Sequence, residues 1–367
     1  MAVDLPTEKR ALLTLHLVPG LGPKLTMALL QRFGSAAAIL SASPADLQEI
    51  PHLGSQLAEA ITRSFRGADV DGELRRMEEY RVRALIPGEP DYPACLAEIP
   101  ARPHLLYLRG ELRLSDAKAI AIVGSRHCTS YGRRMTEKLT AELAGSGFTI
   151  ISGLARGIDG IAHRATLDAK GRTIAVLAGG LARIYPPEHT DLAGEVEAHG
   201  ALLSEAPMLM EPLAGMFPAR NRLISGLARA VVIVEAAARS GALITASHAA
   251  EQGRPVFAVP GPLDSPASAG THALLRQGAI LLRGIEDILE ELEGIRPTVR
   301  PMEVKKPENL DDVQTRIWES LDGGSRHVDE LVQILALPVS QVTNSLVMLE
   351  MRKLVRRLPG NHYERIS

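Results

Sequence analysis

Short apolar segments recur between residues 104 and 295, and most of them are followed by a segment with helical character. The apolar segments lie at residues 105–108, 119–123, 148–152, 173–177, 201–204, 230–235, 255–259 and 279–281. Helical patterns lie at residues 131–144, 159–169 and 243–252. Strands that are apolar on both faces and alternate with helices are typical of a parallel sheet covered on both sides. We therefore predict an α/β domain with a Rossmann-like, doubly wound, mainly parallel sheet and a ligand site at the carboxyl ends of its strands.

Residues 1–85 show a different pattern, in which two similar pieces each separate one apolar helical stretch from the next. The pieces, residues 18–24 and 50–55, both contain proline and glycine, and Gly22 and Gly54 occupy matching positions. Glycine permits the tight turn between two helices. The pieces resemble helix-hairpin-helix motifs, in which backbone amides and a lysine, here Lys24, hold a DNA phosphate. The alternative is a small all-α bundle whose glycines only make turns.

The last part, residues 308–367, follows a charged linker that contains proline, at residues 296–307. It shows helical patterns at 310–321, 328–335 and 340–350 and then a hairpin pattern at 354–363. Three helices and a terminal hairpin predict a winged-helix domain. Its basic residues are Arg352, Lys353, Arg356 and Arg357 among others, and they suit either a wing on DNA or a solvated face. Acidic residues outnumber basic ones in this domain, which argues against its being the principal DNA reader.

Composition narrows the function classes. The 367-residue chain has a net charge of −2, so affinity for nucleic acid must come from local basic patches. No apolar run is long enough to cross a membrane, and no signal-peptide pattern opens the chain, so we expect a cytoplasmic protein with no membrane contact. The two cysteines, Cys95 and Cys128, lie in no metal-ligand pattern and are expected to be reduced thiols. No cofactor or metal ion is expected.

Glycines, arginines and aromatic residues follow the predicted strands. Glycine after a buried strand lets backbone approach a phosphate, the next helix N-terminus favours an anion, and arginine adds a fork of donors. Several arginines at one cleft would repel each other unless an anion joined them, which points to a polyanion. Aromatic faces would stack on bases at ~1–3 kcal/mol per base. The candidate DNA contacts are Gly124, Ser125, Arg126, Arg156, Gly179, Gly180, Tyr185, Phe217, Arg220, Asn221, Arg222, Ser240 and Gly241.

Two alternatives stand beside this interpretation. Phe217 is equally suited to plug the core beneath its loop. Asp159 and His163 lie one helical turn apart, so a metal site or an acid–base pair is conceivable. We favour helix capping by Asp159 and packing of His163 against a neighbouring strand. The sequence contains no GxSxG nucleophile elbow, so hydrolysis of that type is not expected.

The strings at these strand ends resemble the DNA processing protein A family, DprA/Smf. They are GSR at 124–126, SGLARGIDGIAH at 152–163, AGG with IYP at 178–186, FPARNRLISGL at 217–227, SGALITA at 240–246 and AVPG at 258–261. The resemblance implies a Rossmann-like fold with a sterile-alpha-motif-like N-terminal domain and a C-terminal winged helix. It implies a homodimer without enzymatic activity that binds and protects incoming single-stranded DNA. It also implies loading of a RecA-type recombinase during natural transformation. The domain ranges would be 1–85, 104–295 and 308–367.

This chain departs from the family after the IYP string. Family members often have asparagine or lysine there, whereas residues 185–191 are acidic here, with Glu188 and Asp191. A basic DNA contact at that place is therefore not expected. The main alternative function is a nucleotide-processing enzyme, a nucleoside monophosphate hydrolase using the same cleft. Enzymes of that kind carry a Gly-Gly-x-Gly-Thr string with a glutamate three residues after the threonine. In this chain the third residue after Thr245 is His248.

Overall fold

The computed structural model describes residues 5–293 except 52, and residues 310–365 except 322, 323, 353 and 359. The chain forms two compact units, Met1–Arg296 and Pro297–Ser367. The linker expected at 296–307 lies outside the described residues. No single helix in the described part of the chain is long and apolar enough to cross a membrane, and only one bent pair of short helices reaches that length together.

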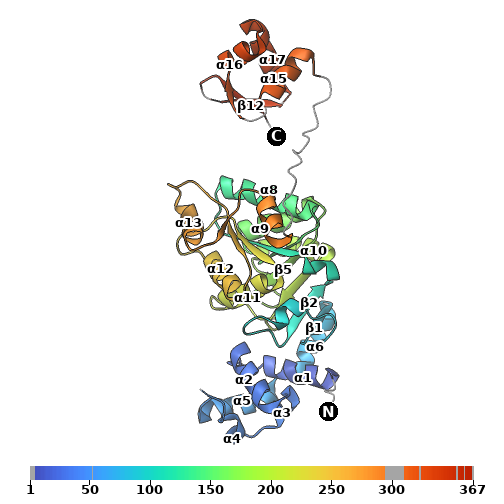
Figure 1. Ribbon diagram of the computed structural model, residues 1–367. Helices are drawn as coiled ribbons and strands as arrows, with labels where there is room; N and C mark the ends of the chain where they lie inside the picture. Colours follow the sequence, from blue (N-terminus) through green and yellow to red (C-terminus); the bar gives the residue numbers. More distant parts are fainter. Residues whose placement is uncertain are drawn as a thin grey trace. The chain divides into compact units, whose positions relative to one another are not determined.

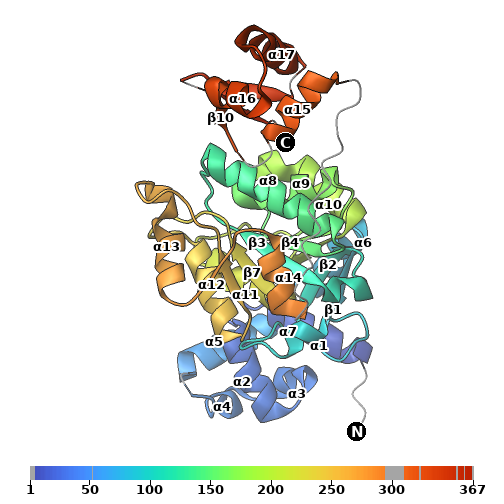
Figure 2. The same cartoon turned by 45° about the horizontal axis from the view of Figure 1, so that its top comes forward.

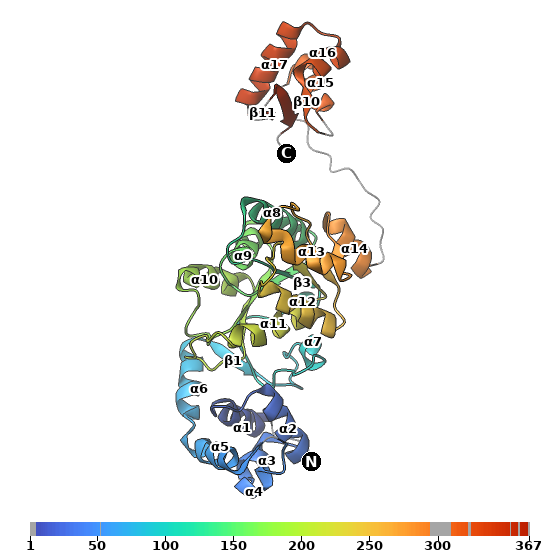
Figure 3. The same cartoon turned by 90° about the vertical axis from the view of Figure 1, so that its left-hand side faces the viewer.

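The first unit begins with six helices. They are α1 (Leu5–His16), α2 (Pro23–Phe33), α3 (Ala36–Ser41), α4 (Pro44–Leu47), α5 (Ser55–Gly67) and α6 (Val70–Glu79). Gly22 and Gly54 directly precede α2 and α5, as the repeated pieces predict. The Glu8 carboxylate accepts the backbone N–H groups of Ala36 and Ala37, which joins α1 to the start of α3. Figure 3 shows these helices gathered together, with α6 leading away from them into the sheet.

A nine-stranded sheet forms the centre of the first unit, in the order β1-β2-β6-β5-β4-β3-β7-β8-β9. The strands are β1 (Val82–Leu85), β2 (Leu106–Gly110), β3 (Ala119–Val123), β4 (Thr149–Ser152), β5 (Thr173–Leu177), β6 (Ala201–Ser204), β7 (Ala230–Ile233), β8 (Val256–Ala258) and β9 (Ile280–Leu281). The β1–β2 and β2–β6 pairs are antiparallel, and all other pairs of this sheet are parallel. The predicted fold class is confirmed. Strand β1 was not predicted, and it belongs to the sheet although it lies within residues 1–85.

Helices cover both faces of this sheet, as Figure 1 shows. One layer contains α8 (Ser130–Gly145), α9 (Ile158–Asp168), α10 (Thr190–His199) and α14 (Ile285–Glu293). The other contains α7 (Ala94–Ala97), α11 (Met216–Leu227) and α12 (Ala242–Glu251), and α13 (Ala269–Arg276) follows β8. Successive residues of β3 point to opposite layers: Ile120 packs with Leu139 of α8, and Ala121 packs with Leu223 of α11. This alternation explains why the strand is apolar at every position.

The second unit contains α15 (Asp312–Ser320), β10 (Arg326–His327), α16 (Val328–Leu335), α17 (Val339–Met351), β11 (Val355–Leu358) and β12 (His362–Arg365). Its strands form a small antiparallel sheet in the order β10-β12-β11. Ile317, Leu331 and Leu346, one from each helix, lie in its core together with Tyr363 of β12. Figure 2 shows the three helices of this unit. The predicted winged helix is confirmed, although Lys353 of its basic cluster lies outside the described residues.

Candidate nucleic-acid interface

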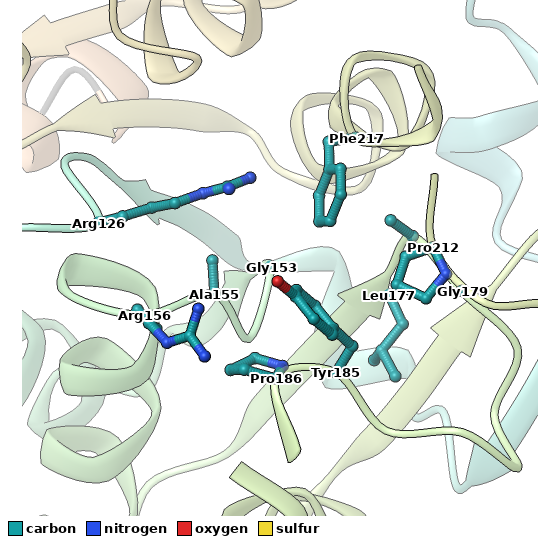
Figure 4. A pocket seen from close by; sticks show the side chains of 11 residues that line it. Arg126, Gly153, Ala155, Arg156, Leu177, Gly179, Tyr185, Pro186, Pro212 and Phe217 are labelled. Carbon is teal, nitrogen blue, oxygen red and sulfur yellow. The ribbon is translucent and has the colours of Figure 1, made fainter. Parts of the chain in front are cut away.

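The carboxyl ends of β5, β4, β3 and β7 are neighbours in the sheet, and the loops that follow them surround two adjoining hollows. The larger hollow is lined by Gly124, Ser125, Arg126, Asp159, Phe217, Arg220, Asn221, Arg239, Ser240 and Gly241, among others. The smaller one, the recess shown in Figure 4, is lined by residues that include Arg126, Gly153, Arg156, Gly179, Tyr185, Pro186, Pro212 and Phe217. Arg126 and Phe217 belong to both linings. Loops distant in sequence thus meet at the edge where this fold binds its ligands.

The loop after β3 is held by backbone contacts that require glycine. A side chain at Gly124 would place its Cβ 2.7 Å from Ile158 and 2.9 Å from the Glu235 carbonyl. The Ser125 N–H donates to that same Glu235 carbonyl at 2.8 Å. Gly157 has a φ of 72° and passes so close to the Ser125 carbonyl that a Cβ there would lie 2.2 Å away. These contacts fix the backbone from which Arg126 projects.

Two arginines and two aromatic rings face one another around the recess. The Arg126 guanidinium lies 4.7 Å from the centre of the Phe217 ring, and that of Arg156 lies 6.0 Å from the Tyr185 ring. The two rings meet edge to face at 6.0 Å. Figure 4 shows Arg126 extending towards Phe217, with Tyr185 between Phe217 and Pro186. Phe217 therefore lines the recess instead of plugging the core, and the two adjacent rings are flanked by one arginine on each side.

Arg156 also has an acidic partner. Its Nε donates to Glu188 Oε1 at 2.5 Å, and both side chains are about half exposed. This hydrogen bond raises the pKa of Arg156 and lowers the pKa of Glu188. The acidic stretch at residues 185–191 thus places a carboxylate directly on one of the candidate DNA contacts.

Arg220 lines the larger hollow and reaches the loop that lines the recess. Its side chain is buried, and its Nη1 donates to the carbonyls of Gly153, at 2.6 Å, and Val176. Asp159 accepts the N–H groups of Gly153 and Ala155 from the same loop, at 3.2 and 3.4 Å. Burial lowers the pKa of Arg220 to about 10 and raises that of Asp159. Both side chains position the loop between β4 and α9. Arg220 was predicted to donate to DNA, but its Nη1 donates to backbone carbonyls of the protein instead.

Arg222 lies two residues further along α11 and outside the linings of both hollows. Its Nη2 donates to both carboxylate oxygens of Glu205 at 2.8 Å. The two side chains are only 8% and 18% exposed. The structure therefore places this predicted DNA contact in a nearly buried ion pair.

The glycine turn after β5 is shaped by a neighbouring loop. The Gly180 N–H donates to the Met210 carbonyl at 2.9 Å, and the Ala182 N–H donates to the Met208 carbonyl at 3.1 Å. A Cβ on Gly180 would lie 2.2 Å from that Met208 carbonyl oxygen, so only glycine allows this approach. Gly179 lines the recess opposite Pro212. Because these glycines have no side chain, the loop at residues 205–212 packs directly on their backbone. Gly179 and this loop together form one wall of the recess.

The larger hollow extends to the N-terminus of α12. Asn221 Nδ2 donates to the Gly241 carbonyl at 3.3 Å, and the Ala242 N–H donates to Ser240 Oγ at 3.3 Å. Arg239 is exposed and also lines this hollow. Arg239 was not among the predicted DNA contacts, although its position directly before the Ser-Gly pair was a usable signal. A helix N-terminus beside an exposed guanidinium favours an anion.

The alternative metal or acid–base site at α9 is not formed. His163 Nδ1 lies 2.7 Å from Thr173 Oγ1 of β5, and burial lowers its pKa to about 3. Asp159 is engaged with backbone N–H groups as described above. No group of three potential metal ligands occurs among the residues that the structure describes. Cys95 and Cys128 are free thiols.

Comparisons with known proteins agree with this architecture. The sequence model of the DNA recombination-mediator protein A family matches residues 83–293, more than half of the chain. Residues 301–361 match the DprA winged helix domain, and residues 10–66 match a SAM-like helix-hairpin-helix tandem.

Individual relatives cover most of the chain. Protein Smf of Synechocystis sp. is 35% identical over 384 residues, which cover 95% of this chain and 96% of that protein. The structure of DNA processing protein A from Streptococcus pneumoniae is 32% identical and has a TM-score of 0.68, with 79% of this chain and 99% of that chain covered. A DNA processing protein A from Helicobacter pylori, whose structure was reported for its single-stranded DNA binding mode, is 32% identical with a TM-score of 0.53 and covers 59% of this chain and 97% of that one. This chain therefore belongs to the DNA recombination-mediator protein A family, DprA/Smf.

Proposed function

We propose that this chain binds single-stranded DNA across the larger hollow and the recess, and that it does so without catalysis. It protects incoming strands as a homodimer and loads a RecA-type recombinase onto them during natural transformation. The observation that carries the proposal is the arrangement of Arg126 on Phe217 and Arg156 on Tyr185 around one opening. The single-stranded DNA binding described for the Helicobacter pylori relative supports it.

The two hollows suit the two chemical parts of an unpaired strand. Arg126, Arg239 and the N-terminus of α12 offer donors to phosphates in the larger hollow. Tyr185 and Phe217 offer faces and edges to bases at the opening of the recess. Bases in a duplex are already stacked and paired, so a splayed single strand fits this combination better.

Hydrolysis of a nucleotide in the same cleft has less support. An enzyme of that type needs a carboxylate free to act as a general acid or base. Asp159 lines the larger hollow, but its carboxylate accepts two backbone N–H groups. Glu251, the carboxylate after Thr245 on α12, lies beside His248 at 3.5 Å instead.

The proposal is tested by binding of matched single-stranded and duplex oligonucleotides at two salt concentrations. We expect the parent to prefer the single strand and to lose affinity with salt, because phosphate contacts release counterions. Arg126→Ala should weaken binding by about 1.5–3 kcal/mol, the scale of a charged hydrogen bond, or roughly 10- to 150-fold. The control is Arg113→Ala, since Arg113 is exposed at the amino end of β3 and pairs with Glu111.

Two results would contradict the proposal. Normal binding by the Arg126 variant would remove the cleft from consideration. A chain that ends at residue 293 should still bind, because the winged helix forms a separate compact unit. Complete loss of binding in that folded truncation would move the DNA site to the winged helix.

A further inference from the structure

Glu73 is a carboxylate of the N-terminal helices that reaches the sheet. It lies on α6, and only 2% of its surface is exposed. Its Oε1 accepts hydrogen bonds from Tyr107 Oη of β2, at 2.8 Å, and from the Met208 N–H, at 2.7 Å. Arg76 Nη1 lies 3.4 Å from the other oxygen. A buried carboxylate needs such partners to compensate for the water that it loses. The position of the Glu73 side chain is therefore fixed by these three partners.

The second of these partners belongs to the loop that forms the recess. Met208 has a fully buried side chain, and its carbonyl accepts the Ala182 N–H of the turn after β5. Two residues later, the Met210 carbonyl accepts the Gly180 N–H. Pro212 then lines the recess, and its Cδ would lie 2.9 Å from a Cβ on Gly179. The loop is thus held from one side by the glycine turn and from the other by Glu73.

We propose that Glu73 is a positioning residue for the single-stranded DNA site. By holding the Met208 N–H, it fixes the height of the loop at residues 205–212 above the glycine turn and so sets the position of the recess wall that Pro212 lines. The N-terminal helices therefore contribute to the DNA site through this hydrogen bond, in addition to the apolar cluster that they share with Met208 and Leu181. This inference rests on the proposed function of the recess.

A Tyr107 variant distinguishes a positioning role of Glu73 from a role in packing alone. Its hydroxyl donates to the same carboxylate oxygen, but Tyr107 lies on β2 and does not line the recess. Tyr107→Phe removes one of the two hydrogen bonds at Glu73 Oε1 and leaves the one to the loop. Glu73→Gln keeps an acceptor for the Met208 N–H, whereas Glu73→Ala removes it.

The experiment measures two quantities on the full chain: affinity for fluorescent oligothymidine and amide hydrogen exchange of residues 178–182 and 205–212. For Glu73→Ala we expect faster exchange in both segments and about three- to tenfold weaker binding, the scale of one hydrogen bond. Glu73→Gln should restore both quantities to parental values. Tyr107→Phe should melt earlier but bind like the parent.

The outcomes are distinct. A folded Glu73→Ala protein with parental exchange and affinity would overturn the inference, as would a Tyr107→Phe protein that loses as much affinity as Glu73→Ala. If Glu73→Ala does not fold, the double variant Glu73→Leu/Tyr107→Phe leaves the Met208 N–H as the one buried partner of Glu73 without an acceptor, since Arg76 is partly exposed and keeps Asp69. The same two outcomes apply. If the parent itself does not bind oligothymidine, the proposed function fails, while the exchange data still report whether Glu73 holds the loop.

Discussion

Replacing Arg222 by alanine tests whether this arginine serves the fold or the DNA. The change removes a guanidinium that donates to both oxygens of Glu205 at 2.8 Å. The Glu205 side chain is 18% exposed, so its carboxylate would be left largely buried without this partner. Breaking a buried pair on one side costs about 3–5 kcal/mol. For a unit of this size, that cost corresponds to a fall in Tm of roughly 5–15 °C.

Thermal unfolding and oligothymidine binding would be measured on the same preparations. We expect Arg222→Ala to lower Tm but to bind DNA with parental affinity well below the transition. The double variant Glu205→Ala/Arg222→Ala should be more stable than Arg222→Ala alone, because no unpaired carboxylate remains. An unchanged Tm together with a tenfold or greater loss of affinity would refute this reasoning and restore Arg222 as a DNA contact, as its sequence motif suggests.

Three further predictions concern the surroundings of the site. Glu188→Gln removes the carboxylate that pairs with Arg156 and should raise affinity for single strands about two- to fivefold at low salt. The gain is small because an exposed ion pair holds Arg156 only weakly, and it should vanish in an Arg156→Ala background. Gly180→Ala should lower both Tm and affinity, since its Cβ would lie 2.1 Å from a carbonyl oxygen, whereas Gly194→Ala meets open space on a helix and should be neutral or stabilising. His163 has a folded pKa of about 3 against 6.5 unfolded, so the unfolded chain binds the extra proton and the free energy of unfolding should fall as pH drops below about 6.5. Denaturant titrations between pH 7 and pH 4 should show a smaller decrease for His163→Asn than for the parent, and parallel curves would contradict this assignment.

The sequence predicted the central strands because burial on both faces leaves a local signal. Residues 119–123, 173–177 and 201–204 form strands with the predicted bounds, since each is a short, mostly apolar segment that is buried at every position. Strand β1 carries no such signal. Its four residues include the exposed Arg83, and pairing with β2 defines it. Its inclusion in the sheet therefore depends on tertiary structure, because only the pairing with β2 makes these residues a strand.

The candidate site divides in the same way. Sequence alone determined that glycines and arginines follow several parallel strands, and the topology of such sheets requires these loops to meet at one edge. It could not determine which arginines face the hollows. Arg220 lines the larger hollow, but it donates to the carbonyls of Gly153, just after β4, and Val176 of β5. Arg222 pairs with Glu205 after β6, whereas Arg126 stays available beside Phe217. Those partners are distant in sequence, and only the packed chain brings them within hydrogen-bond distance. The same holds for Glu73 and Met208, because the burial that makes a carboxylate dependent on its partners exists only after the N-terminal helices have packed against the sheet.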